Sequence, residues 1–111
     1  MKIITVYKDT EGVNDFISHN KNQPKWRVFY TKGLECSCCG LKANSLIFIQ
    51  EKDGNILIRL GWHQLHGHRK RKIILFNIDH IIPKKKGGTD GLWNTRPCCE
   101  KCNNEKGDKT M

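Results

Sequence analysis

The sequence predicts one small domain of the α+β class. The chain has 111 residues, a length typical of a single domain. Short runs of β-branched and aromatic residues predict strands, and a stretch with apolar residues at spacings of three and four predicts a helix. We therefore expect strands and helices that share one core, with residues 1–35 as an N-terminal extension and residues 36–109 as the main body.

The N-terminal extension is expected to contain one strand and two helices. Residues 2–7 alternate weakly between apolar and polar and indicate a short strand. Residues 10–19 carry the helical spacing, so we expect a short helix there. Residues 26–30 are apolar and aromatic, a pattern that does not decide between strand and helix. We favour a helix that ends in a turn at Gly33.

The main body is expected to contain three strands, a loop and a final helix. Residues 45–50 and 55–60 flank an Asp-Gly pair, a turn signal that predicts a β-hairpin. Residues 72–79 predict a third strand, and the Pro- and Gly-rich residues 81–93 predict a loop. Residues 100–109 lack a helix breaker over most of their length and predict a short helix.

The charge of the chain indicates a polyanionic partner. Lys and Arg number 20 against 11 Asp and Glu, a formal net charge of +9, and residues 69–111 hold 11 of the cations. Such an excess favours nucleic acid as the partner. No apolar run approaches the ~20 residues that span a membrane, and the first residues lack the pattern of a secretory signal. We therefore expect a cytoplasmic protein.

The six cysteines predict a metal site. They include two C-x-x-C pairs, which are separated by far more residues than a compact zinc ribbon needs. In a reducing compartment such pairs indicate one tetrahedral, structural Zn²⁺ rather than disulfides. The predicted ligands are Cys36, Cys39, Cys99 and Cys102. Cys38 and Cys98 are left over; a disulfide between them is conceivable, and we favour free thiols.

A set of short motifs lies between the third predicted strand and the last predicted helix. They read Asp79-His80-Ile81-Ile82-Pro83, Gly87-Gly88-Thr89-Asp90, Asn94 and Cys99-x-x-Cys102-Asn103-x-x-Lys106-Gly107-Asp108. With the first C-x-x-C pair, these motifs resemble the HNH endonuclease family, and most of all its small phage and bacterial members. The resemblance covers Cys36–Gly40 and Asn77–Lys109. It implies a ββα-metal (His-Me finger) nuclease core in residues 36–109, with zinc-binding knuckles and an additional β-hairpin.

The resemblance also implies a role for each of four residues. His80 would be the general base, and Asn94 would hold the loop and orient His80. Asp79 and Asn103 would bind the catalytic divalent cation. The family often has His where this chain has Asn103, so the chain is an H-N-N variant. An amide oxygen is a hard ligand and favours Mg²⁺ or Mn²⁺.

DNA is the partner that the resemblance implies, with a phage packaging or restriction protein as a further candidate. Cleavage of a phosphodiester bond needs an activated water and neutralised phosphate charge. The basic residues expected to hold flanking phosphates are Lys84, Lys85, Lys86, Lys101, Lys106, Arg69 and Arg71. Few of them look suited to reading base edges, so we expect low or helper-dependent sequence specificity. The expected location is the cytoplasm of a bacterial or phage-infected host cell.

Other functions fit parts of the same pattern. A zinc-knuckle module that only binds nucleic acid would explain the cysteines and the charge, but it would not need Asp79-His80 together with Asn94 and Asn103. An RNA-directed nuclease and an accessory subunit of a phage packaging or restriction complex also remain open. Trp93 is expected to belong to the core rather than to stack on bases.

Three histidines, His63, His66 and His68, form a cluster with three open interpretations. They could bind a transition metal, present hydrogen-bond donors to DNA, or lie in a polar loop. The proposed chemistry requires none of them.

Overall fold

One antiparallel sheet forms the centre of the molecule in the computed structural model, which describes residues 2–66 and 70–106. Its strands follow the order β1-β2-β3-β4-β5, so each strand pairs with the next one along the chain. The strands are β1 (Lys2–Tyr7), β2 (Ser45–Gln50), β3 (Ile56–His66), β4 (Lys70–His80) and β5 (Thr95–Cys99). The predicted α+β class is confirmed.

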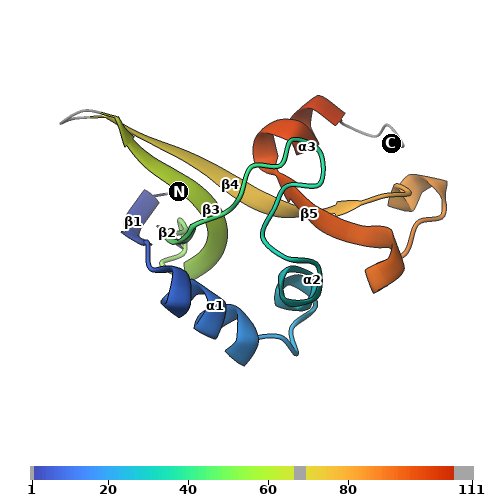
Figure 1. The fold of residues 1–111 in the computed structure, drawn as a ribbon, viewed down its shortest axis with the longest axis horizontal. Helices are drawn as coiled ribbons and strands as arrows, with labels where there is room; N and C mark the ends of the chain where they lie inside the picture. Colours follow the sequence, from blue (N-terminus) through green and yellow to red (C-terminus); the bar gives the residue numbers. More distant parts are fainter. Residues whose placement is uncertain (1, 67–69, 107–111) are drawn as a thin grey trace.

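Three helices accompany the sheet in the described part of the chain: α1 (Thr10–His19), α2 (Pro24–Lys32) and α3 (Glu100–Lys106). In Figure 1, α1 and α2 lie together at the bottom of the view and α3 lies at the top. Both N-terminal helices and the strand over residues 2–7 are confirmed. None of the helices described in residues 2–66 and 70–106 is long and apolar enough to cross a membrane.

The core lies between α1, α2 and the sheet. It is built from apolar side chains that the helical spacing turns inward, together with inward-facing strand residues. The rings of Phe16 and Trp26 meet edge to face with centroids 4.9 Å apart, which joins α1 to α2. The buried side chains include Val13, Ile17, Trp26, Phe29, Leu46, Leu60 and Phe76. Helix α2 ends at Lys32, and Gly33, which follows it, has a φ of 94° that suits glycine.

The predicted hairpin between β2 and β3 is present. Gly54 has a φ of 87°, which the turn requires and which other residues rarely adopt. The backbone N–H of Glu51 donates to Asn55 O at 2.8 Å, and Asp53 Oδ1 accepts from the backbone N–H of Asn55 at 2.9 Å. These bonds fix the register in which Gln50 pairs with Ile56.

Strand β3 is longer than the sequence predicted. The sequence predicted a strand over residues 55–60, but β3 continues to His66 and pairs with β4. A Cβ on Gly61 would lie 3.0 Å from Ile47 Cγ1, so glycine lets the neighbouring strand pack closely here rather than ending β3. Strand β4 likewise begins at Lys70, before the predicted residue 72.

His63 lies in the extended part of β3, and the polar-loop interpretation is therefore wrong for this residue. Its side chain is buried, and its backbone N–H donates to Asn44 Oδ1 at 2.9 Å. His66 belongs to β3, but its side chain lies outside the described part of the structure, as does the whole of His68. The metal and DNA interpretations of this cluster stay predictions.

The two edge strands are both irregular. The register of β1 against β2 shifts between Ile3 and Thr5. At the other edge, β5 contains Pro97, which has no N–H to donate. The carbonyl of Pro97 accepts from the backbone N–H of Ser37 at 3.0 Å, so the segment with the first cysteine pair lies against this edge.

The C-terminal elements form a continuous unit. Strand β4 pairs with β5 in antiparallel fashion, with His80 opposite Thr95, and β5 runs directly into α3. The connection from β4 to β5 was predicted as a loop, and it contains two short 3-10 turns, η1 (Lys84–Lys86) and η2 (Leu92–Asn94). This unit gathers most of the residues that the sequence singled out.

Candidate active site and metal centre

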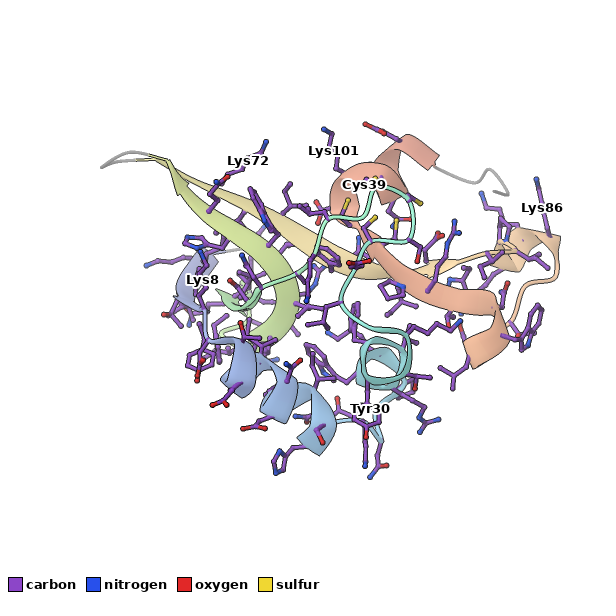
Figure 2. All side chains as sticks on the ribbon, viewed as in Figure 1. Lys8, Tyr30, Cys39, Lys72, Lys86 and Lys101 are labelled. Carbon is purple, nitrogen blue, oxygen red and sulfur yellow. The ribbon has the colours of Figure 1, made fainter. Side chains whose placement is uncertain are left out.

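The two C-x-x-C pairs come together although about sixty residues separate them. The sulfurs of four cysteines lie within 4.8 Å of one another, as expected from the sequence. They are Cys36, Cys39, Cys99 and Cys102. Figure 2 shows Cys39 beside α3, whose first turn carries Cys102. A four-cysteine cluster of this kind could hold zinc.

The spacing of these sulfurs fits a tetrahedral ion. Four thiolates at ~2.3 Å from Zn²⁺ lie roughly 3.8 Å from one another. Cys39 Sγ and Cys99 Sγ are 3.8 Å apart. A second group, Cys36 with Cys38 and Cys98, supplies only three sulfurs, and Arg96 Nη2 approaches Cys38 Sγ at 3.9 Å. A guanidinium disfavours a cation there, so the four-cysteine group is the better candidate.

Hydrogen bonds prepare Cys36 to be a thiolate. Burial alone would raise the pKa of its thiol, but backbone N–H groups of Cys99, Cys39 and Cys38 lower that pKa to about 6. The Cys99 N–H lies 3.3 Å from Cys36 Sγ. The pKa of Cys98 is raised, first by burial and then by the negative charge of nearby thiolates. Burial raises the pKa of Cys99 and Cys102 as well, so the lowered pKa favours Cys36 as a thiolate ligand, and the choice of the other three ligands rests on the positions of their sulfurs.

Asp79 lies near the end of β4 and is almost fully buried, with 5% of its surface exposed. Its Oδ2 accepts from Arg96 Nε at 2.9 Å. Arg96 stands opposite Asp79 in the β4–β5 pairing, which explains why the two side chains meet. The ion pair offsets the cost of burying the carboxylate and fixes its orientation.

His80 is the last residue of β4 and is half-buried. Its Nε2 lies 2.7 Å from Asp90 Oδ1, and Lys84 Nζ lies 3.0 Å from the same oxygen. The hydrogen bond from His80 and then that from Lys84 lower the pKa of Asp90, so this exposed carboxylate is ionised at neutral pH. An ionised carboxylate only accepts hydrogen bonds, and the Nε2 of His80 therefore donates.

Asn94 ends η2 and is completely buried. Its Oδ1 accepts from the backbone N–H of Ile82 at 2.7 Å, and its Nδ2 donates to Ile82 O at 3.0 Å and Thr89 O at 2.8 Å. Its own carbonyl accepts from the backbone N–H of Ile81 at 2.8 Å. One side chain thus joins the start of the loop after His80 to its far end.

The remaining predicted site residues lie on α3 and on the loop. Asn103 is half-buried on α3, one residue after Cys102. Lys101 is exposed on the same helix, and the three lysines of η1 are exposed on the loop. Figure 2 shows Lys86 at the outer end of that loop.

For three residues predicted to contact phosphates, the side chain or the whole residue lies outside the described part of the structure. Arg69 lies outside the described residues. Arg71 belongs to β4 and Lys106 to α3, but their side chains lie outside the described part of the structure. Their roles stay predictions.

Residues 66–109 match the HNH endonuclease family. The match confirms the resemblance over β4, β5 and α3, the elements that carry the residues described above. HNH nucleases act on DNA and use a divalent metal ion. No curated protein and no solved structure matched the chain.

Sequence reasoning missed three features of residues 66–109, which are called the HNH segment from here on. Asp90 was noticed only as part of a motif, and Arg96 was not considered. The side chain of Arg96 could have been found from strand pairing, but only if the register of β4 and β5 had been known. Trp93 was expected in the core, and that prediction is wrong, because 64% of its surface is exposed.

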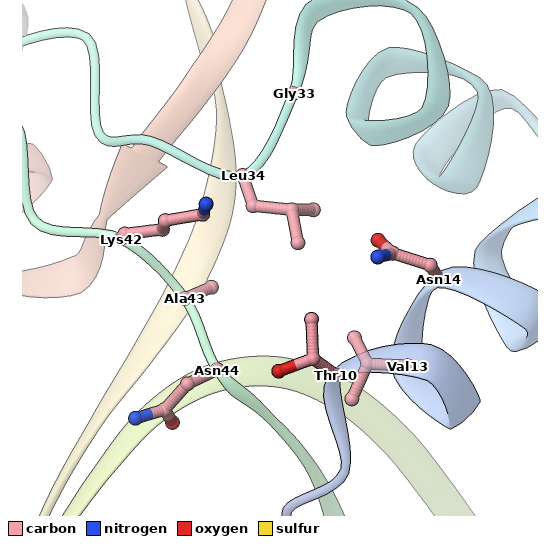
Figure 3. A pocket seen from close by; sticks show the side chains of 8 residues that line it. All are labelled: Thr10, Val13, Asn14, Gly33, Leu34, Lys42, Ala43 and Asn44. Atoms are coloured by element: carbon pink, nitrogen blue, oxygen red, sulfur yellow. The ribbon is translucent and has the colours of Figure 1, made fainter.

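A cavity of about 470 Å³ lies outside the HNH segment (Figure 3). It is lined by Thr10, Val13, Asn14, Gly33, Leu34, Lys42, Ala43 and Asn44. These residues come from α1 and from the segment that surrounds the first cysteine pair. The cavity therefore plays no part in the chemistry considered below.

Proposed function

We propose that the protein is a metal-dependent DNA endonuclease. The observation that supports this most is the arrangement around His80: a histidine at a strand end, hydrogen-bonded to Asp90, beside a loop that the buried Asn94 holds in place. A module that only binds nucleic acid would not require a histidine oriented in this way. The match of residues 66–109 to the HNH endonuclease family supports the same reaction class.

His80 is the general base of this proposal. Because its Nε2 donates to the ionised Asp90, a neutral His80 carries its lone pair on Nδ1. Nδ1 can therefore take a proton from the water that attacks the phosphorus. Asp90 stabilises the positive charge that His80 acquires, and Lys84 keeps Asp90 ionised.

Asp79 and Asn103 are the residues that would hold the catalytic cation, Mg²⁺ or Mn²⁺. Both offer oxygen atoms, the ligands that these hard cations prefer. Asp79 would hold the cation in addition to the ion pair that its Oδ2 makes with Arg96. When bound, such an ion acts as a Lewis acid that neutralises charge on the phosphate.

The other residues position the substrate and the loop. Asn94 holds the ends of the loop together, and Lys84, Lys85, Lys86 and Lys101 neutralise flanking phosphates, as would Lys106, Arg69 and Arg71. The four-cysteine cluster would hold a structural zinc ion, and four thiolates would complete its usual set of ligands. We also propose a cytoplasmic location and low intrinsic sequence specificity, with a phage packaging or restriction protein as a partner that supplies the target.

One observation favours a second candidate, a zinc-knuckle module that binds nucleic acid without cleaving it. Arg96 already neutralises the buried Asp79, as it would in a protein that needs no catalytic cation. Cleavage assays separate the two candidates.

The test is to incubate supercoiled plasmid with the purified protein and either Mg²⁺ or Mn²⁺. We expect nicked or linear DNA from the wild-type protein, and a rate at least 10²-fold lower for His80→Ala, because general-base catalysis contributes about 10²–10⁴-fold. His19→Ala is the matched control, since His19 is an exposed histidine on α1, and it should cleave as the wild type does.

Two outcomes would contradict the proposal. Plasmid that the wild-type protein binds but leaves intact with both cations would support the binding module instead. Equal cleavage by the wild type and His80→Ala would remove His80 as the base.

A further inference from the structure

Trp93 is the least buried of the large apolar side chains in the described part of the molecule. Its surface is 64% exposed, and its neighbour Leu92 is 37% exposed. Both belong to η2, so two apolar side chains project next to each other from one short turn. An exposed tryptophan forgoes the large stabilisation that burial of its ring would give, and this points to a partner that covers it.

The backbone beneath Trp93 is firmly held. The ammonium group of Lys32, from α2, donates to the carbonyls of Leu92 and Thr95, which lie on either side of Trp93 and Asn94. Asn94 is fully buried, and Thr95 Oγ1 donates to Gly91 O at 3.1 Å. The exposed ring is therefore mounted on an anchored turn and not on a loose loop.

Gly91 lets the indole ring lie against the backbone. A Cβ at this position would be 2.9 Å from both Cδ1 and Nε1 of Trp93, closer than such atoms normally approach. Any other residue would push the ring away, so the absence of a side chain at Gly91 helps to set its direction. Because the turn that carries the ring is already anchored, its backbone loses little conformational freedom when the ring contacts a partner.

Trp93 lies close in the fold to the proposed catalytic residues. His80 pairs with Thr95, which is two residues from Trp93, and the N–H of Ile81 donates to the carbonyl of Asn94. The same loop carries the exposed lysines of η1. An exposed aromatic ring on the same loop as clustered lysines is a combination suited to single-stranded nucleic acid, with charge on the phosphates and stacking on the bases.

We propose that Trp93 is a stacking platform for an unpaired base, with Leu92 packing beside it. In an intact duplex the faces of the bases are covered by their neighbours, so a flat ring gains most where a base is already unstacked. The substrate class that follows is DNA with an unpaired base close to the cleaved phosphate, as in a bulge, a branch or a single strand. This inference rests on the proposed nuclease function.

Binding measurements in a His80→Ala background, with Mg²⁺ present, test the platform without cleavage. Two labelled DNAs are compared by fluorescence anisotropy: a fully paired duplex, and the same duplex with one bulged base. We expect the His80→Ala protein to bind the bulged DNA about 5- to 150-fold more tightly, the range for one base stacked on an aromatic side chain. Adding Trp93→Ala should abolish this preference, and adding Trp93→Phe should keep most of it.

Two controls separate stacking from charge and from folding. Tyr30→Ala removes another exposed aromatic ring, 51% exposed on α2, and should keep the full preference. Trp93→Ala should leave the salt dependence of binding unchanged, whereas Lys85→Gln should lower the slope of log K against log salt by about 0.9. Thermal melting should be similar for Trp93→Ala and the parent, because the ring is exposed.

The inference is overturned if the His80→Ala protein binds both DNAs equally, or if adding Trp93→Ala keeps the preference for the bulged DNA. If the His80→Ala protein binds neither DNA, the proposed function is overturned as well. Cleavage of paired plasmid by the wild type with no preference for the bulge would leave the nuclease proposal standing and remove the platform.

Discussion

The side chain of Asn94 makes a set of hydrogen bonds that no other type of side chain could make at this position. Asn94 satisfies a backbone donor and two backbone acceptors at once, within a fully buried environment. Only an amide side chain offers an acceptor and two donors in one plane. Asp could not supply the donors, and a hydroxyl would be too short to reach both ends of the loop.

Asn94→Ala is therefore expected to destabilise the protein by about 2–4 kcal/mol, since it leaves several buried backbone groups without a partner. Urea unfolding followed by circular dichroism would measure the loss. Asn104→Ala, which changes an exposed asparagine of α3, should shift stability by no more than about 0.5 kcal/mol. A loss below about 1 kcal/mol for Asn94→Ala would show that water replaces the amide.

The sequence identified residues that belong to short motifs, and it missed residues whose partners are distant in the chain. Asp79, His80 and Asn94 stand out because they belong to short motifs. The partner of Asp79 is Arg96, seventeen residues away, and only the pairing of β4 with β5 brings them together. The exposure of Trp93 was beyond sequence reasoning, because the apolar character of a residue does not reveal what its position faces.

At the scale of elements, the two cysteine knuckles connect the middle of the chain to its C-terminal unit. In the first knuckle, Gly40 N–H donates to Cys36 O at 2.9 Å, and Cys36 N–H donates to Leu41 O at 2.8 Å. The second knuckle spans the junction of β5 and α3. A metal ion shared by both would hold these elements together without requiring a larger core.

We predict one zinc ion per chain, which can be measured by elemental analysis of the purified protein. Cys39→Ser should lose this zinc and lower the melting temperature strongly, although Cys39 is exposed and contributes little to packing. Cys38→Ser removes a neighbouring thiol outside the four-cysteine group and should keep the metal. Unchanged zinc content in Cys39→Ser would contradict the assignment of ligands.

The elements themselves were predicted with uneven success. Residues 10–19 form a helix with the expected bounds, because the spacing of their apolar residues is clear. The favoured helix over 26–30 is present as Pro24–Lys32. The extension of β3 past Gly61 could not be foreseen, since it depends on pairing with the equally extended start of β4.

At the scale of the whole molecule, positive charge is spread over several elements, and the three lysines of η1 form one local group of it. The molecule measures 45 × 31 × 30 Å. Figure 2 shows Lys86 at one end of the longest axis and Lys8 towards the other. Phosphates bound near the proposed site would therefore contact the lysines of η1 rather than those of the N-terminal part.

The salt dependence of DNA binding should therefore be set by the lysines near the proposed site and not by lysines elsewhere. Replacing Lys84, Lys85 and Lys86 with Gln should reduce the slope of log K against log salt by about 2–3, because each phosphate contact contributes about 0.9. The same charge change at Lys2, Lys8 and Lys52, which are exposed elsewhere, should leave the slope nearly unchanged. Titrations at several salt concentrations distinguish the two, and equal slopes would refute a localised contact.

The irregular edges of the sheet have a consequence for how copies of the protein meet. A strand from another molecule needs a straight row of N–H and C=O groups as a template. The shift between Ile3 and Thr5 interrupts that row on β1, while Pro97 and the segment at Ser37 block it on β5. Growth of the sheet from chain to chain, the usual first step of fibrous aggregation, is thus disfavoured at both ends.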